Sequence, residues 1–303
     1  MTITVLVPDE AGVRALDNVP GVKAVRYTTD DPPAEAAEAA VLIPRPGSSA
    51  PYVPLLERMP DLKLIQLLSA GAEEWVGLVP DGVLLSTCRG AHGGSTAEWV
   101  VAVLLSLYRE LDGFAAAQRE GRWTAHTTDT LQGKRVMIVG AGDLGKELQR
   151  RLEPFDTEVT LVGVTARDDI RSIDELPGLL GAYDAVVMMV PLTSRTTRMV
   201  DARFLAAMAD GAVLVNAARG PVVDHAALLA ELQSGRLRAA LDVTDPEPLP
   251  PGHPLWTAPN LLLTPHVGGA ARGSGRRAYA VAAAEIGRYV SGDLPHNLVH
   301  GEY

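Results

Sequence analysis

Three side chains in the C-terminal third of the sequence are of types that can hold a carboxylate and move a proton. Arg219 stands in Val-Asn-Ala-Ala-Arg-Gly, Glu247 in Asp-Val-Thr-Asp-Pro-Glu-Pro, and His266 in Thr-Pro-His-Val-Gly-Gly. A guanidinium binds a carboxylate through two parallel hydrogen bonds, and an imidazole transfers protons near neutral pH. Each residue alone also fits a plain role, as a surface cation, a turn acid and a core histidine. Together they predict proton transfer to or from a small acid.

A glycine-rich segment upstream provides a second chemical signal. Gly-Ala-Gly-Asp-Leu-Gly, residues 140–145, follows the apolar run Val136–Val139 and precedes a helical pattern. In a dinucleotide site the first glycine permits a tight turn, the second lets the backbone approach a pyrophosphate, and the third lets the helix lie close to the strand. Such glycines can also serve packing alone, but the flanking strand and helix favour the site, with phosphates at the helix N-terminus. The predicted contacts are Gly140, Gly142, Asp143, Leu144 and Gly145.

The end of the next strand predicts which dinucleotide binds. An acid there accepts hydrogen bonds from the ribose of NAD, whereas a basic group accommodates the extra phosphate of NADP. The position falls near Gly163 or Val164, where there is no acid, and Thr165 and Arg167 follow. We therefore predict an NADP preference, with Thr165 and Arg167 as contacts. The alternative is NAD, with the acids at 168 and 169 contacting the ribose.

The segments around these motifs predict alternating strands and helices. Apolar strands over Val213–Asn216 and Leu261–Thr264 end shortly before Arg219 and His266, and ligands gather beyond the carboxyl ends of parallel strands. The alternation indicates the α/β class, with doubly wound parallel sheets. Further strands are expected at 2–7, 40–43, 62–68, 136–139, 159–164, 183–190 and 239–243, and helices at 34–40, 96–118, 144–152, 228–232 and 279–290.

Composition limits the classes of partner and the cellular location. The 303 residues, 47% apolar and 21% charged, are enough for about two globular domains. A net charge of -10 disfavours binding to nucleic acid or to anionic membranes. The single cysteine, Cys88, has no partner for a disulfide, and no Cys/His spacing predicts a metal site. The N-terminus lacks the features of a signal peptide and no run is long enough to cross a membrane, so we expect a cytoplasmic protein.

Several phrases, in the same order along the chain, resemble the D-isomer-specific 2-hydroxyacid dehydrogenase family, particularly its glyoxylate and hydroxypyruvate reductases. The resemblance extends over most of the chain. The phrases are Gly140-Ala-Gly-Asp-Leu-Gly145, Val190-Pro-Leu-Thr193, Val215-Asn-Ala-Ala-Arg-Gly-Pro-Val-Val-Asp224, Ala240-Leu-Asp-Val243, Glu247-Pro-Leu-Pro250 and Thr264-Pro-His-Val-Gly268.

The resemblance implies a role for each of the three side chains. Arg219 would hold the substrate carboxylate and polarise the keto oxygen, a task that suits a planar, permanently charged group. His266 would give a proton to that oxygen as the nicotinamide delivers a hydride to the carbon, and would be the base in the reverse direction. Glu247 would accept from the other ring nitrogen, orienting the imidazole and favouring its protonated form.

Further expectations concern the walls of the site. By the same resemblance, backbone N–H groups of the Ser69–Glu73 loop would cover the substrate carboxylate, although a plain turn is the alternative. Asp242 would contact the nicotinamide carboxamide. The expected substrate contacts are Ala70, Gly71, Arg219 and His266, and the remaining expected cofactor contacts are Pro191, Thr196, Ala217, Asp242, His266 and Gly268.

The resemblance also implies an architecture and an activity. A Rossmann-type dinucleotide-binding domain, residues 97–271, would be inserted into a discontinuous, flavodoxin-like substrate domain made of residues 1–96 and 272–303. A homodimer with the helix 96–118 at its interface is expected. The implied reaction is hydride transfer between NADP(H) and a small 2-keto or D-2-hydroxy acid. The alternative is a nucleotide-sensing binding protein, since some relatives act as corepressors.

The remaining candidate residues receive no chemical role. Arg89, His92 and Trp123 are expected to be polar loop residues or packing aromatics. Four further histidines have no partner spacing and are expected to face solvent: His225, His253, His296 and His300.

Overall fold

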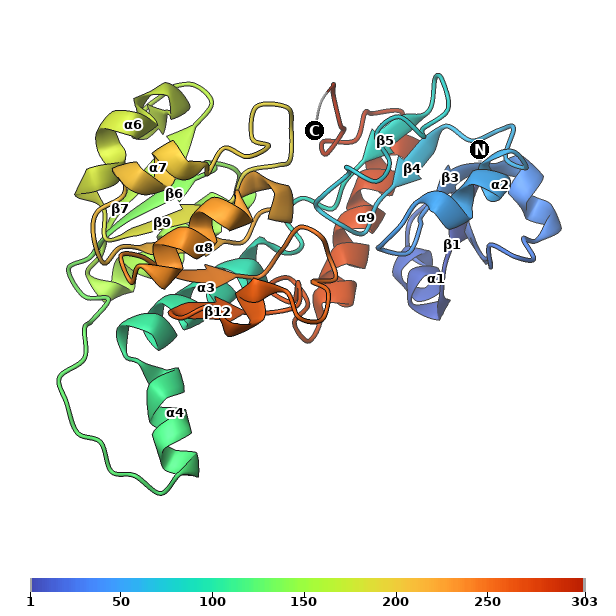
Figure 1. Ribbon diagram of the computed structural model, residues 1–303. Coiled ribbons are helices and arrows are strands. Elements are labelled where there is room, and N and C mark those ends of the chain that lie inside the picture. Colours follow the sequence, from blue (N-terminus) through green and yellow to red (C-terminus); the bar gives the residue numbers. More distant parts are fainter. Residues whose placement is uncertain (1, 302–303) are drawn as a thin grey trace. The chain divides into compact units, whose positions relative to one another are not determined.

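The computed structural model describes residues 2–301 and divides the chain into two compact units (Figure 1). Unit 1 comprises Met1–His92 and Arg272–Tyr303, and unit 2 comprises Gly93–Ala271. Each unit contains one parallel sheet with helices on both faces. The predicted class, α/β with two doubly wound sheets, is confirmed. No helix of the described residues is long and apolar enough to cross a membrane.

Unit 1 is built on a five-stranded sheet in the order β2-β1-β3-β4-β5, with all strands parallel. Helices α1 and α9 pack on one face, and α2 with two short 3-10 helices packs on the other. Because both faces are covered, the central strands are mostly apolar. The elements are β1 (Ile3–Val7), α1 (Glu10–Leu16), β2 (Val22–Arg26), β3 (Ala39–Leu42), α2 (Val53–Leu56), β4 (Leu64–Gln66), β5 (Leu84–Ser86) and α9 (Ser274–Val290).

Unit 2 is built on a seven-stranded parallel sheet in the order β12-β11-β10-β9-β6-β7-β8. Helices α3 and α5 cover one face, and α6, α7 and α8 cover the other. The strands are β6 (Arg135–Val139), β7 (Glu158–Gly163), β8 (Ile170–Ser172), β9 (Ala185–Met188), β10 (Val213–Asn216), β11 (Arg238–Leu241) and β12 (Leu261–Leu263). The helices are α3 (Gly93–Tyr108), α4 (Leu111–Arg119), α5 (Asp143–Leu152), α6 (Leu176–Leu179), α7 (Ala202–Ala207) and α8 (His225–Gln233).

The strand order reverses between β6 and β9. From β6 the chain builds outward through β7 and β8, then returns to the other side of β6 and builds outward through β9, β10, β11 and β12. In such sheets the crevice for a ligand opens at the carboxyl ends of the two strands where the order reverses. The glycine-rich turn after β6 therefore lies at the crevice.

The single helix expected over residues 96–118 is wrong. Helix α3 begins earlier, at Gly93, and ends at Tyr108, and α4 begins at Leu111. Between them Glu110 has φ 51°, a left-handed conformation that interrupts a right-handed helix. Figure 1 shows α4 and the segment after it reaching away from the sheet of unit 2.

The alanine-rich helix expected over residues 34–40 is shorter than predicted. A 3-10 helix covers Ala34–Glu38, and the chain then enters β3 at Ala39. Ala39 and the residues after it pair in parallel with β1, and this strand pairing overrides the helical preference of alanine.

Candidate active site

The glycine-rich turn has the geometry that a dinucleotide needs. Gly140 has φ 124°, and a Cβ there would lie 2.3 Å from the carbonyl oxygen of Met189. A Cβ on Gly145 would lie 2.0 Å from the carbonyl oxygen of Gly140. The first and third glycines are therefore required by close backbone contacts between β6, α5 and the end of β9.

The middle glycine faces open space. No atom lies within 4 Å of the position that a Cβ on Gly142 would take. Gly142 is also the N-cap of α5, and as a glycine it offers no side-chain acceptor to the first helical turn. Open space over the backbone and an N-terminus without a side-chain cap together fit a bound pyrophosphate.

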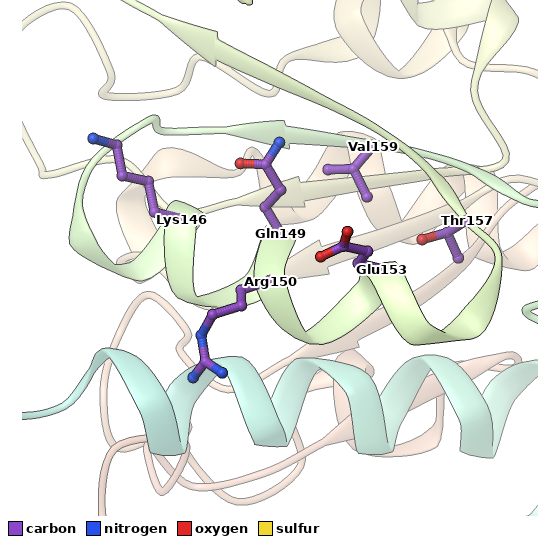
Figure 2. Close-up of a pocket in the computed structure, with 6 residues that line it drawn as sticks. All are labelled: Lys146, Gln149, Arg150, Glu153, Thr157 and Val159. Carbon is purple, nitrogen blue, oxygen red and sulfur yellow. The ribbon is translucent and has the colours of Figure 1, made fainter.

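A separate pocket of about 400 Å³ lies along the outer side of α5 (Figure 2). Its lining carries both signs of charge, and it extends from the middle of the helix to the start of β7. It contains no residue of the glycine-rich turn, so it is distinct from the dinucleotide crevice. The lining residues are Lys146, Gln149, Arg150, Glu153, Thr157 and Val159.

The segment expected to select the cofactor is an exposed turn between β7 and β8. The backbone groups of Arg167 and Ile170 bond to each other at 3.0 and 2.8 Å, and Asp168 adopts φ 47°. Thr165 and Arg167 are exposed, as are both acids. Within residues 2–301 the Arg167 guanidinium makes no hydrogen bond or ion pair. One cation and two acids thus share this turn.

The loop after β9 is held by Thr196, whose hydroxyl donates to the carbonyl of Pro191 at 2.6 Å and accepts from the N–H of Thr193 at 2.8 Å. Directly after the neighbouring strand β10, the N–H of Ala217 donates to the carbonyl of Met188 at 3.1 Å. Thr196 and Ala217 are both buried. Since Met189 contacts Gly140, this loop borders the crevice.

The three predicted catalytic side chains follow three neighbouring strands. Arg219 follows β10, Glu247 follows β11, and His266 follows β12. Because these strands are adjacent and parallel, all three lie at the carboxyl edge of one sheet.

Glu247 and His266 form a direct contact. The Nδ1 atom of the imidazole lies 2.6 Å from Oε1 of the carboxylate, and the two side chains are 46% and 42% exposed. With Nδ1 facing a carboxylate, Nε2 is left for another partner. The catalytic roles of the two side chains stay a prediction.

Asp242 holds the backbone around His266. The residue is 4% exposed, and its carboxylate accepts from the hydroxyl of Thr264 at 2.6 Å and from the N–H groups of Val267 and Gly268 at 2.8 and 2.7 Å. Its carbonyl accepts from the N–H of His266 at 2.7 Å. Asp242 therefore shapes the loop in which His266 adopts φ 54°. Its expected contact with the nicotinamide stays a prediction.

Arg219 is half-buried, and its Nη1 donates to the carbonyl of Ala218 at 2.7 Å. Asn216, fully buried at the end of β10, donates to the carbonyl of Arg219 at 3.0 Å and accepts from the N–H of Ala218 at 3.0 Å. Sequence reasoning gave Asn216 no role. The signal was a polar residue ending an otherwise apolar strand, two residues before Ala218.

A pocket of about 300 Å³ opens beside the Glu247–His266 pair. Both side chains line it, and most of its other walls are apolar or neutral. Its lining comprises Asp242, Thr244, Glu247, Pro248, Leu249, Trp256, Leu263, Thr264, Pro265 and His266.

His225 contradicts the expectation that it faces solvent. Its Nδ1 lies 3.2 Å from the carbonyl oxygen of Asp245, and its Nε2 is buried without a hydrogen-bond partner. The reason is the start of α8, where Asp224 caps the helix and the first helical side chain meets the loop after β11. His253 is also engaged, because its Nδ1 accepts from the N–H of Leu255 at 3.2 Å. His296 and His300 are exposed, as expected.

The Ser69–Glu73 loop follows β4 in unit 1. Ala70 and Gly71 are half-buried, and the Ser69 hydroxyl donates to the carbonyl of Gly71 at 2.7 Å. Substrate contacts by these two residues stay a prediction.

The residues that received no role behave differently from one another. Arg89 donates to Asn297 at 3.1 Å, and His92 contacts the carbonyl of Leu68 at 2.9 Å. Trp123 is 98% exposed and therefore packs against nothing within a single chain, so its interpretation as a packing aromatic is wrong there. Across the described range 2–301, no group of three or more His, Cys, Asp or Glu side chains could hold a metal ion.

Comparison with known proteins identifies relatives of this chain. A family model described as the NAD binding domain of D-isomer specific 2-hydroxyacid dehydrogenases matches residues 101–268. The glyoxylate reductase of Thermofilum pendens is 31% identical over 265 residues, covering 82% of this chain and 78% of that protein. Glyoxylate/hydroxypyruvate reductase B of Citrobacter koseri is 32% identical over 261 residues, covering 81% and 80%.

Solved structures share the fold over nearly the whole chain. A D-isomer specific 2-hydroxyacid dehydrogenase from Xanthobacter autotrophicus, in complex with NADPH and MES, has a TM-score of 0.85 at 31% identity and covers 99% of this chain and 98% of that one. An NADPH-dependent glyoxylate/hydroxypyruvate reductase from Sinorhizobium meliloti, in complex with NADP and malonate, has a TM-score of 0.77 at 26% identity, with coverage of 99% and 97%.

Proposed function

Because the chain belongs to the D-isomer specific 2-hydroxyacid dehydrogenase family, we propose that it reduces glyoxylate, hydroxypyruvate or a similarly small 2-keto acid with NADPH. The family predicted from the sequence motifs is confirmed, and membership makes the chain an NAD(P)-dependent oxidoreductase of 2-hydroxy acids. The observation that carries the proposal is the 2.6 Å contact between Glu247 and His266 at the carboxyl edge of the sheet.

In the proposed reaction, a bound reduced nicotinamide supplies the hydride. His266 donates the proton from Nε2 to the keto oxygen, because Glu247 engages Nδ1 and leaves Nε2 for the substrate. Arg219 binds the substrate carboxylate and polarises the keto oxygen. After transfer, the carboxylate of Glu247 keeps the neutral ring in the orientation that accepts a new proton.

The proposed cofactor is NADP, with NAD as the alternative. The support is the exposed turn after β7, in which the Arg167 guanidinium has no partner among residues 2–301 and no acid stands at the strand end. The relative from Xanthobacter autotrophicus binds NADPH. We assign the pyrophosphate to the turn Gly140–Gly145, and the walls of the cofactor crevice to Pro191, Thr196, Ala217, Asp242 and Gly268.

Unit 1 is the proposed substrate domain, with Ala70 and Gly71 as substrate contacts, and unit 2 is the proposed dinucleotide-binding domain. A homodimer is also part of the proposal. In its support, Leu111 at the start of α4 is 52% exposed and Trp123 beyond it is 98% exposed. Large apolar side chains on a projecting segment are typical of protein interfaces. A reducing compartment such as the cytoplasm suits the buried free thiol of Cys88.

The test is NADPH oxidation by the purified protein in the presence of glyoxylate, hydroxypyruvate and bulkier 2-keto acids. We expect turnover with the two small acids and a decline as the side chain of the acid grows. Tight NADPH binding without turnover of any acid would contradict the proposal and would favour a nucleotide-sensing protein.

A further inference from the structure

We propose that His225 is a positioning residue, whose ring holds the loop that carries Glu247 and thereby fixes the direction of His266. The inference rests on the proposed roles of Glu247 and His266. His225 is a half-buried histidine that the proposed reaction does not use; its Nε2 atom is buried, and its Nδ1 lies 3.2 Å from the carbonyl oxygen of Asp245.

The loop of residues 244–247 has few attachments. Within it, the hydroxyl of Thr244 donates to the carbonyl of Pro246 at 2.9 Å. In the described part of the chain, only two hydrogen bonds join these four residues to anything outside them. One is the bond from His225 to Asp245, and the other is the contact of Glu247 with His266. Apart from the contact with His266, the bond from His225 is therefore the one hydrogen bond that holds this loop to other described residues.

Packing at Gly220 brings the same loop against the segment that carries Arg219. A Cβ on Gly220 would lie 1.9 Å from the carbonyl oxygen of Thr244 and 2.7 Å from the backbone nitrogen of Asp245. His225 follows Gly220 by five residues, so the Arg219 segment contacts the loop twice. Loss of the His225 bond would free the Asp245 carbonyl, and Glu247 is two residues further on.

The charge state of His225 suits this role. A ring nitrogen beside a carbonyl must carry a proton, so Nδ1 donates and Nε2 is the unprotonated atom. Nε2 is buried without a partner, and a second proton there would have no acceptor. Burial is the largest influence on the pKa of His225 and lowers it, and the charge of His253 acts in the same direction. The hydrogen bond to Asp245 and the charges of Asp245 and Asp224 act in the opposite direction. Asp224 is itself engaged by Arg198 and by the N–H groups of Ala226 and Ala227.

Substitutions at His225 separate positioning from packing. Asparagine places an N–H donor near the position of Nδ1, glutamine places its amide near Nε2, and alanine removes both.

Loss of one hydrogen bond of ordinary strength corresponds to about a five- to tenfold fall in rate. For His225→Ala and His225→Gln we expect that fall in kcat, little change in KM for the keto acid, and a displaced pH profile of kcat. His225→Asn should restore kcat to within about twofold. His296→Ala, which changes an exposed histidine of unit 1, is the control.

The double variant His225→Ala/Glu247→Gln tests whether the effect passes through Glu247. If it does, the His225 substitution should cost little more once Glu247 is changed, since coupled residues are not additive. Full turnover with an unchanged pH profile in His225→Ala, equal losses in the alanine and asparagine variants, or additive losses in the double variant would overturn the inference. An unimpaired Glu247→Gln enzyme would instead contradict the proposed function. Thermal unfolding of each variant identifies any that fail to fold.

Discussion

At the scale of single residues, Arg219 combines a fixed backbone with a half-buried side chain. Asn216 bonds to the N–H of Ala218 and to the carbonyl of Arg219, and a guanidinium is a planar group of the kind that binds a carboxylate through two parallel hydrogen bonds. The -10 net charge of the chain would repel an anionic substrate, so a local cation at the site carries the attraction.

Arg219→Lys tests this role. Lysine keeps the charge but loses the planar fork, so the carboxylate would be held at one point instead of two. We expect KM for the keto acid to rise by about tenfold or more, with a lower kcat because the keto oxygen is less well aligned. Steady-state kinetics at saturating NADPH measure both. Unchanged KM in the lysine variant would refute a bidentate contact.

Glu247→Gln tests the carboxylate beside His266. The carboxylate can both orient the imidazole and balance its charge, whereas a neutral amide can only orient it. We therefore expect kcat of the variant to fall by about tenfold or more, because hydrogen bonds to charged groups are the stronger ones, with little change in KM for NADPH. Steady-state kinetics of both proteins measure the two constants. An unchanged kcat would show that the 2.6 Å contact has no part in the proton transfer.

Arg167→Ala tests the choice of cofactor. A charge-assisted hydrogen bond to phosphate contributes about 1.5–3 kcal/mol, which corresponds to roughly a ten- to hundredfold change in affinity. We expect KM for NADPH to rise by that factor while KM for NADH stays constant. If NADH is the better substrate for the unaltered enzyme, the acids at 168 and 169 select the cofactor instead.

At the scale of elements, the turn between β6 and α5 combines an open glycine with a closely packed one. Gly142 and Gly145 have opposite surroundings, one open and one in close contact with Gly140. They form a matched pair of test positions in the same turn.

Gly142→Ala should fold as well as the unaltered chain, because nothing lies within 4 Å of the added methyl group. The methyl group would stand where a pyrophosphate approaches, so KM for NADPH should rise by about tenfold or more. Gly145→Ala should instead lower the unfolding temperature, because its Cβ would lie 2.0 Å from the carbonyl oxygen of Gly140. Thermal unfolding without cofactor, together with cofactor titration, distinguishes the two. Equal loss of stability in both variants would contradict this division of roles.

The elements also show what the sequence could and could not predict. Strands buried on both faces carry runs of apolar residues, which is why Val213–Asn216 was located to the residue and β6 to within one. The break between α3 and α4 was missed because it depends on the left-handed conformation of Glu110, and glutamate is a good helix former. The contact of His225 with Asp245 was missed because it depends on where α8 meets a loop that is distant in the sequence.

At the scale of the whole molecule, the order of the strands brings motifs that are distant in the sequence to one edge of a sheet. Arg219, Glu247 and His266 are separated by tens of residues, yet they follow the neighbouring strands β10, β11 and β12. The glycine-rich turn lies where the strand order of the same sheet reverses. Motif order predicted the family and this edge of the sheet, whereas the hydrogen bonds of Asp242 and Asn216 required the folded structure.

Proton transfer by His266 is the central step of the proposed reaction. Kinetics of His266→Ala with NADPH and glyoxylate or hydroxypyruvate test that step, with NADPH binding measured in parallel to verify the fold. General acid catalysis predicts a fall in kcat of about a hundred- to ten-thousandfold, with NADPH affinity largely retained. A variant that binds NADPH and turns over the keto acid at the rate of the unaltered enzyme would contradict the account.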